Sequence, residues 1–312
     1  MLPSVALGKP PPCFRLFDRP YFLLTLAILF WSGNLILARA MRTEIPPIGL
    51  TFWRWFIGLL LLLKFALPPL KTDLPQILHH WKLLLLFSGL GIVGFPVLFY
   101  TGLQSTTAMN GALIQATMPL AIVLVSYLLF RDTISWRQVL GILLSLAGAI
   151  AIVSQGSWQI LQTLSFNPGD IWILGAIACY AAYSSLLRLR PLLHPLSFLA
   201  ILFGFATLLL LPFYIWESLT QQAVQFNLLT LCSVGYIAIF PSIFSQLFFN
   251  RGVELIGANR AGLLANLLPV FGSLMAIIFL GETFHHFHAI GMGLILLGIF
   301  LATYWHPQKS QP

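Results

Sequence analysis

Charged side chains are scarce in this sequence. Of its 312 residues, 8% are charged and 59% are hydrophobic, which leaves far too little polar surface to cover a soluble globule of this size. The composition therefore excludes a soluble globular domain and indicates an integral membrane protein.

Acidic residues are fewer still, and each of the eight lies near the end of an apolar run or in a connection: Asp18, Glu44, Asp73, Asp132, Asp170, Glu217, Glu254 and Glu282. With no carboxylate expected at the membrane midplane, an antiporter in which a proton and a cationic substrate share a buried acid is disfavoured. No histidine is expected in mid-helix, so no cluster of catalytic groups is visible. An ATP-driven pump is also excluded, because the chain lacks a G-x-x-x-x-G-K-[ST] phosphate loop.

Cysteines are too few and too scattered to suggest a disulfide framework or a metal site, since the chain has only Cys13, Cys179 and Cys232. The spacing of His285, His286 and His288 is compatible with metal ligands. These histidines fall in an expected external turn, where polar residues are ordinary, so no metal and no other cofactor is predicted.

Long apolar runs are what the sequence does have. Each is long enough to cross a hydrocarbon core of roughly 30 Å as a helix, and about twice as long as a barrel strand needs to be. The runs lie near residues 20–39, 47–67, 83–102, 108–130, 136–154, 170–188, 195–216, 228–250, 259–280 and 287–305. The sequence therefore predicts an all-α membrane protein of ten transmembrane helices.

The formal charge of +8 would suggest a nucleic-acid partner in a soluble protein, but here the basic residues fall in short connections and fix the orientation. With the N-terminus in the cytoplasm, thirteen basic residues lie inside: Lys9, Arg15, Arg19, Lys64, Lys71, Lys82, Arg131, Arg137, Arg188, Arg190, Arg251, Arg260 and Lys309. Only Arg39 and Arg42 lie outside, and Arg54 lies within a helix. We expect a multi-pass protein of the inner or plasma membrane with both termini cytoplasmic and no nucleic-acid partner.

The chain repeats itself at an interval of 150 residues, which superimposes 108–153 on 258–303. The shift brings Pro119 onto Pro269 and Asp132 onto Glu282, and it also matches the glycine pair Gly141 and Gly148 with a second pair. Such a repeat predicts two related five-helix halves, at 20–154 and 169–306, with a connector at 155–168 and cytoplasmic tails at 1–19 and 307–312.

Five helices per half is an odd number, so the second half must enter the membrane in the opposite orientation. The turn between the third and fourth helices lacks Lys and Arg, whereas its counterpart contains Arg251 and Arg260, as an inversion requires. Inverted repeats around a central cavity are a recurrent plan of secondary transporters that work by alternating access.

Uncharged polar and aromatic residues within the runs are the candidates for a substrate site on the first, fourth, sixth and ninth helices: Trp31, Asn34, Gln115, Tyr180, Tyr183 and Asn266. An aromatic wall with a few amides is typical of small-molecule pockets. The alternative is that these residues only join helices through hydrogen bonds, with Ser32 and Gly33 permitting close packing.

Arg54, flanked by Trp53 and Trp55, is the one basic residue expected within a membrane helix. It either extends to the outer interface, with the tryptophans as belt residues, or contacts a substrate carboxylate.

Four prolines, Pro96, Pro119, Pro241 and Pro269, are expected to bend their helices around the cavity, because proline cannot donate a backbone hydrogen bond. A static kink is the alternative interpretation for the weak points at Pro96 and Pro241.

The residues also resemble a known family, the EamA-type transporters of the drug/metabolite transporter superfamily. The resemblance covers nearly all of 20–305 and rests on Phe30-Trp31-Ser32-Gly33-Asn34, Arg54, Gly169-Asp170, Tyr180-Ala-Ala-Tyr183, Leu267-Leu268-Pro269-Val270, Leu280-Gly281-Glu282 and Gly291. The first half departs from the pattern, since Phe130-Arg131-Asp132 stands where the family commonly has Leu-Gly-Glu. The resemblance implies ten helices, a central cavity and transport, often outward, of amino acids, other metabolites or drugs.

The leading hypothesis is a secondary transporter that moves a small neutral or zwitterionic metabolite, such as an amino acid, outward across the bilayer. The alternative is an intramembrane enzyme or a lipid-handling membrane protein. The substrate, the direction of flux, the coupling and the oligomeric state stay open at this point.

Overall fold

The computed structural model describes residues 18–41, 44–106, 108–162, 166–221, 223–280 and 283–304, and these ranges contain helices and no strands. Eight helical segments within them are long and apolar enough to cross a membrane: Pro47–His79, Trp81–Ser105, Asn110–Phe130, Trp136–Val153, Pro168–Leu189, Pro195–Thr220, Leu228–Ile256 and His286–Thr303. The all-helical prediction is confirmed. The two other predicted runs are occupied by α1 (Pro20–Ala40) and by α13 (Ala258–Leu263), η4 (Leu264–Leu267) and α14 (Leu268–Leu280), so the count of ten membrane helices stays a prediction.

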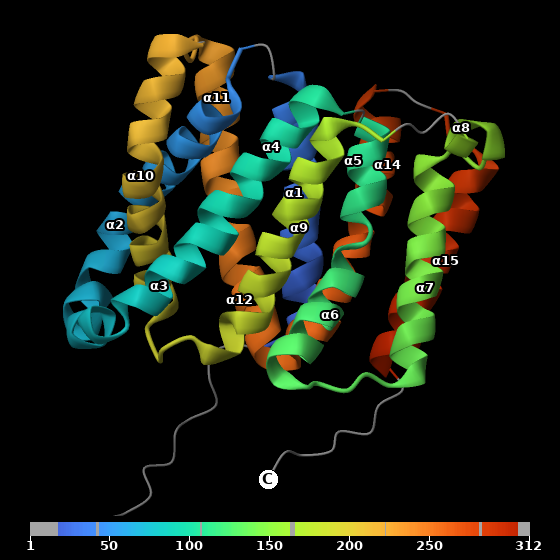
Figure 1. Ribbon diagram of the computed structural model, residues 1–312, viewed down its shortest axis with the longest axis horizontal. Helices are drawn as coiled ribbons and strands as arrows, with labels where there is room; N and C mark the ends of the chain where they lie inside the picture. Colours follow the sequence, from blue (N-terminus) through green and yellow to red (C-terminus); the bar gives the residue numbers. More distant parts are fainter. Residues whose placement is uncertain are drawn as a thin grey trace, which may run out of the picture.

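The two halves of the chain contain matching successions of helices (Figure 1). After α1, the first half comprises α2 (Pro47–His79), α3 (Trp81–Phe87), η1 (Ser88–Gly94), α4 (Phe95–Ser105), α5 (Ala108–Gln115), α6 (Met118–Phe130) and α7 (Trp136–Val153). Besides α13, η4 and α14, the second half comprises α9 (Pro168–Leu186), η2 (Leu187–Leu189), α10 (Pro195–Thr220), α11 (Leu228–Ile237), η3 (Ala238–Phe244), α12 (Ser245–Ile256) and α15 (His286–Tyr304). A short helix, α8 (Trp158–Gln162), lies in the connector between the halves.

Helix α2 is longer than the sequence predicts. It continues past the predicted end at residue 67 to His79 and includes Pro68, Pro69 and Pro75. Each proline removes one backbone N–H and clashes with the preceding turn, so it bends a helix, but here the prolines do not end it.

A π-helical segment interrupts the third membrane helix of each half at the same place. η1 and η3 begin at Ser88 and Ala238 and end at Gly94 and Phe244, which is the 150-residue interval of the sequence repeat. Pro241 lies inside η3, and Pro96 is the second residue of α4, directly after η1. Single π-turns inside helices are frequent at functional sites.

The fourth membrane helix of each half is also interrupted, and its proline follows the interruption. Pro119 is the second residue of α6, after the turn at Ala116 and Thr117, and Pro269 is the second residue of α14, after the 3-10 segment η4. At the start of a helix proline costs little, because its missing N–H would have no helical partner there.

Helices α7 and α15 pack closely and antiparallel on the right of Figure 1. A Cβ atom at Gly141 would lie 2.5 Å from the carbonyl oxygen of Gly298, and one at Gly148 would lie 2.5 Å from that of Gly291. Seven residues are about two helical turns, so each glycine pair lies on one face, and small residues let membrane helices approach closely.

Helices α2 and α10 are joined by reciprocal contacts at their ends. The carboxylate of Glu217 on α10 accepts hydrogen bonds from the backbone N–H groups of Ile48, 3.1 Å, and Gly49, 2.7 Å, at the start of α2. Asp73 on α2 accepts one from the N–H of His194, 2.9 Å, at the start of α10. A carboxylate is stabilised at a helix start because the first N–H groups have no helical partner.

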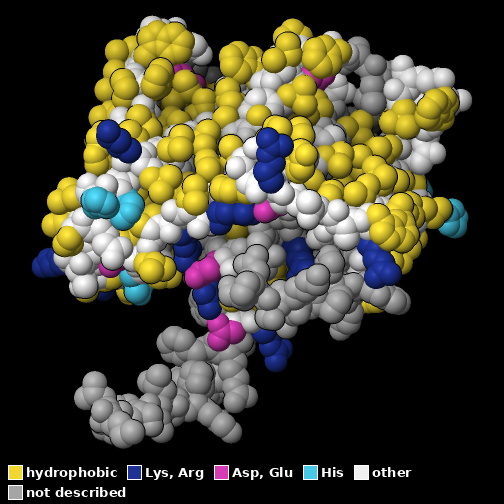
Figure 2. All heavy atoms as spheres, turned by 60° about the horizontal axis from the view of Figure 1, so that its bottom comes forward, with side chains coloured by type: hydrophobic (Ala, Val, Ile, Leu, Met, Phe, Trp, Pro, Cys, Tyr) yellow, Lys and Arg dark blue, Asp and Glu magenta, His cyan; other side chains and the backbone are white. Residues whose placement is uncertain are grey.

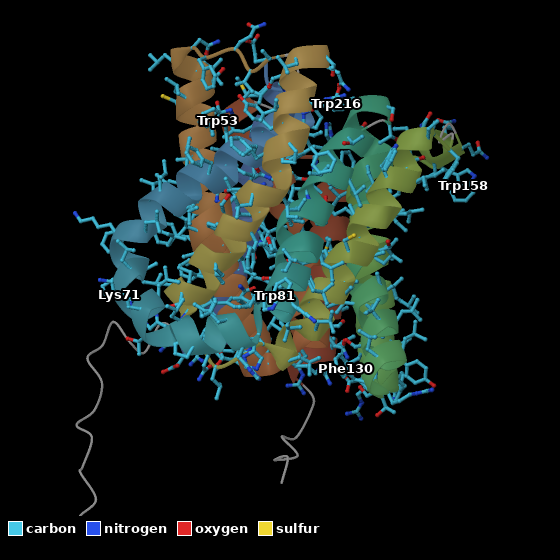
Figure 3. The ribbon with its side chains drawn as sticks, turned by 60° about the vertical axis from the view of Figure 1, so that its left-hand side comes forward. Trp53, Lys71, Trp81, Phe130, Trp158 and Trp216 are labelled. Carbon is cyan, nitrogen blue, oxygen red and sulfur yellow. The ribbon has the colours of Figure 1, made fainter. Side chains whose placement is uncertain are left out.

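The two ends of the bundle differ in charge. α1 begins and α15 ends at the lower end of Figure 1, and Figure 2 shows Lys and Arg side chains gathered on that face. In Figure 3, Trp53, Trp158 and Trp216 lie toward one end, whereas Lys71, Trp81 and Phe130 lie toward the other. Ion pairs cluster at the basic end: Arg188 with Asp132, Arg190 with Glu254, and Arg251 with both Asp18 and Glu254.

The glycine contact between α7 and α15 predicts unequal effects for two alanine substitutions on α15. Gly291→Ala places a methyl group against Ile152 and the carbonyl of Gly148, at 2.5 and 2.7 Å, so it should destabilise the protein by about 1–3 kcal/mol. Gly293 has no atom within 4 Å of such a methyl group, and Gly293→Ala should be neutral or slightly stabilising. Melting temperatures of the two purified variants in detergent check this, and equal values would show that the close contact does not limit stability.

Candidate functional site

A cavity opens between the two halves near the middle of the bundle. It encloses about 670 Å³ of empty space, counting solvent at its mouth. Its lining comes from helices of both halves: Trp31, Asn34, Arg54, Trp55, Gly91, Phe95, Pro96, Phe99, Tyr100, Gln115, Met118, Tyr180, Gln246, Ala265 and Leu268.

Four of the six residues predicted to bind substrate line this cavity, namely Trp31, Asn34, Gln115 and Tyr180. The other two do not. Tyr183 is fully buried and donates its hydroxyl to Asn250 Oδ1 at 2.8 Å, and Asn266 is 1% exposed on η4, between the lining residues Ala265 and Leu268.

Arg54 lines the cavity from α2 and is 4% exposed. Its Nε donates to Ser242 Oγ and its Nη1 to the Tyr100 hydroxyl, both at 2.9 Å, and its guanidinium carbon lies 4.4 Å from the centre of the Trp55 ring. The interpretation that Arg54 extends to the outer interface is therefore wrong. Its side chain stays inside because two hydroxyls and an aromatic face hold it there.

Tyr100 connects Arg54 to the first helix. Asn34 Nδ2 donates to the Tyr100 hydroxyl at 2.9 Å, and the same hydroxyl accepts from Arg54. A tyrosine oxygen has two lone pairs and can accept both bonds. The chain of hydrogen bonds joins α1, α2 and α4 along one wall of the cavity.

Aromatic rings form another part of the wall. The Trp31 indole donates from Nε1 to the carbonyl of Pro241 in η3, at 3.1 Å, which fixes the orientation of the ring. Tyr180 lies edge-on to Trp31, with ring centres 5.8 Å apart, and contacts Phe95 at 5.0 Å. The η3 segment thus supplies both the carbonyl that holds Trp31 and the hydroxyl that holds Arg54.

Sequence reasoning missed Gln246, Tyr100 and Ser242 as site residues. Gln246 is 4% exposed, lines the cavity, and has no hydrogen-bond partner for its Oε1 in the described structure. The helix-breaking pair Phe240-Pro241 was the available signal, because Ser242 follows it directly and Gln246 lies about one helical turn farther along.

Two contacts lie beyond the cavity in the direction of the basic end of the bundle. Tyr183 and Asn250 lie about one turn beyond the lining residues Tyr180 and Gln246, and their hydrogen bond joins α9 to α12. Farther along, Arg188 binds Asp132.

The contacts of Arg54 predict that Ser242→Ala destabilises the protein more than another serine substitution. Ser242→Ala removes an acceptor from a buried guanidinium, and hydrogen bonds to charged groups contribute about 1.5–3 kcal/mol. Ser197 is equally buried, but its hydroxyl has no partner in the described structure, so Ser197→Ala serves as the control. Thermal unfolding in detergent should show a lower midpoint for Ser242→Ala alone; matching midpoints would mean that the serine does not support Arg54.

The model of the EamA-like transporter family matches this chain twice, at residues 19–154 and 167–304. The two matched ranges coincide with the two successions of helices described above.

Known proteins resemble the chain over almost its whole length. The Bacillus subtilis (strain 168) protein named uncharacterized transporter YyaM is 26% identical and covers 91% of this chain, and the alignment covers 93% of that protein. A Chlamydia trachomatis serovar D protein, named as an S-adenosylmethionine/S-adenosylhomocysteine transporter, is 23% identical over 90% of this chain and 88% of its own.

A crystal structure of another protein superposes with a TM-score of 0.75 at 21% identity, over 91% of this chain and 96% of that one, which shows a shared fold. The relatives are named as transporters and not as enzymes. Its apolar helices make the protein a multi-pass membrane protein, and the double match places it in a family: the chain belongs to the EamA-like transporter family.

Proposed function

We propose that the protein is a secondary transporter for a small metabolite that carries a carboxylate and is neutral or zwitterionic overall, with amino acids as the type case. The observation that carries this proposal is the position of Arg54, a buried cation on the wall of the central cavity. Net transport is expected to be outward, in line with the family resemblance.

Arg54 has hydrogen-bond donors to spare. A guanidinium has five N–H groups, of which the Nε–H and one on Nη1 bind Ser242 and Tyr100. The other donors suit a carboxylate, for which arginine offers a planar fork of parallel N–H groups. Trp31, Phe95 and Phe99 offer an apolar surface for the rest of the molecule.

The name of one relative supports this proposal. Both compounds in the name of the Chlamydia trachomatis relative contain an amino acid group with a carboxylate. Recognition of such an amino acid group is what Arg54 is proposed to provide in this chain.

The proposed mechanism is alternating access of two inverted five-helix repeats. The exchange of partners supports it: Gly141 faces Gly298 while Gly148 faces Gly291, which is the pattern that a two-fold relation between antiparallel helices produces. The contacts of Glu217 and Asp73 with the opposite helix starts follow the same pattern. Inverted repeats permit two related shapes, each open to one side, around a midplane site.

We expect both termini in the cytoplasm of a cell with this protein in its inner or plasma membrane, because Lys and Arg gather at the end where α1 begins and α15 ends. Reporter fusions at residue 312 should be active only in the cytoplasm. As an internal check, a single cysteine at Ser157 should react with an impermeant reagent from outside and one at Lys82 should not. The reverse pattern would refute the orientation.

The function is tested by efflux from proteoliposomes that contain a uniformly ¹³C-labelled cell extract. Mass spectrometry of the outside medium should show amino-acid-like carboxylates leaving faster than from protein-free liposomes. Retention of every labelled metabolite, or release of compounds without a carboxylate only, would contradict the proposal.

For a metabolite found in this way, Gln115→Ala should lower the apparent affinity about tenfold, which corresponds to about 1.4 kcal/mol, without changing the melting temperature. Gln104→Ala is the matched control, since Gln104 is exposed on α4 and does not line the cavity. If both variants bind normally, Gln115 only joins helices.

A further inference from the structure

The positive charge of Arg54 is not neutralised by the described part of the protein. Its contacts are the Ser242 and Tyr100 hydroxyls and the ring of Trp55. None of the ion pairs among the described residues includes it, and no Asp or Glu lines the cavity.

The buried carboxylates of the described residues are engaged elsewhere. Asp170 accepts from Asn110 Nδ2 at 3.0 Å and from the backbone N–H of Asn167 at 2.9 Å. Glu217 accepts from the first N–H groups of α2. Both acids therefore stabilise helix starts, and Arg54 depends on the contents of the cavity for its counter-charge.

Two hydrogen-bond acceptors on the wall are also unsatisfied. The Tyr180 hydroxyl and Gln246 Oε1 line the same cavity, at 3% and 4% exposure, and have no partner in the described structure. A buried polar group without a partner costs free energy. An amino acid would satisfy all three groups. Its carboxylate can pair with Arg54, and its ammonium can donate to the two acceptors and lie against the face of the Trp31 ring.

We infer, building on the proposed function, that this protein is an exchanger, in which the cavity closes readily around a carboxylate-bearing substrate and poorly without one. Alternating access requires a state closed to both sides. In that state water cannot solvate the guanidinium, and an unpaired charge within a membrane is costly. A bound carboxylate removes this cost, so the loaded protein crosses the closed state faster than the empty one.

The consequence is a difference between two kinds of flux. Exchange needs only loaded protein to cross, whereas net efflux needs the empty protein to return. A cost of about 1.4 kcal/mol for the empty crossing already gives a tenfold difference in rate. We therefore expect exchange to be at least tenfold faster than net efflux.

The test uses proteoliposomes loaded with the ¹³C-labelled extract, with equal potassium on both sides and valinomycin present so that no potential limits net flux. The outside contains either buffer alone or the same extract without label. The rate at which labelled amino acids and other carboxylates emerge, measured by mass spectrometry, should rise at least tenfold when the unlabelled extract is present. The ratio of the rate with unlabelled extract outside to the rate with buffer outside is measured on the unaltered protein, so this first test requires no variant.

Substitutions at Arg54 test whether the positive charge of this side chain causes the difference between the two rates. Arg54→Gln removes the cation, so net efflux should become nearly as fast as exchange and the ratio should fall close to one. Arg54→Lys keeps the cation and should keep the ratio high. Trp53→Phe is the matched control, because Trp53 is adjacent in sequence, hydrogen-bonds Tyr214 and does not line the cavity; its ratio should equal that of the unaltered protein.

The outcomes separate the inference from the proposed function. A ratio near one in the unaltered protein would overturn exchange while leaving transport intact, and so would a high ratio that persists in Arg54→Gln. No emergence of label in either medium would overturn the transport function itself, and the inference with it.

Discussion

Lipid offers no hydrogen-bond partners, so a polar group within the membrane must find its partners inside the protein. Arg54 is the most demanding such group in the described cavity. Its guanidinium brings together Tyr100 from α4, Ser242 from η3 and, through Tyr100, Asn34 from α1. The wall of the cavity is therefore arranged around one cation, and the aromatic rings occupy the space that this network leaves.

The π-helical segments make that arrangement possible. In η3 the Ser242 hydroxyl binds the carbonyl of Ile237, five residues earlier, and also meets Arg54, while the carbonyl of Pro241 accepts from Trp31. The equivalent contact, between η1 and α10, is chemically different. Counted from the proline that begins each helix, the position in α10 that matches Arg54 is Leu202, whose carbonyl accepts from the Ser88 hydroxyl. The backbone repeats, but the charge does not, so the two walls of the cavity differ in charge.

The sequence predicts the positions of the helices well, because long apolar runs and the 150-residue repeat are local or periodic signals. It predicts facing directions poorly. Tyr180 and Tyr183 were both expected at the substrate site, and their ring centres lie 5.7 Å apart, yet only Tyr180 lines the cavity, while Tyr183 binds Asn250. The sequence alone also does not show that Arg54 is buried, because its partners Tyr100 and Ser242 lie 46 and 188 residues away along the chain. Such contacts depend on packing between helices, which one sequence does not encode locally.

The two halves are joined by close packing in one place and by ion pairs in another. The glycine faces of α7 and α15 interlock at backbone distance, and such a contact cannot open gradually, because close-packed surfaces lose their attraction over a small gap. At the basic end, by contrast, the halves are joined by the partly exposed pairs of Arg251 with Asp18 and Arg188 with Asp132, and exposed ion pairs contribute about 0–1 kcal/mol each. Under the proposed alternating access, a change of shape would break these ion pairs more readily than it would separate the glycine faces.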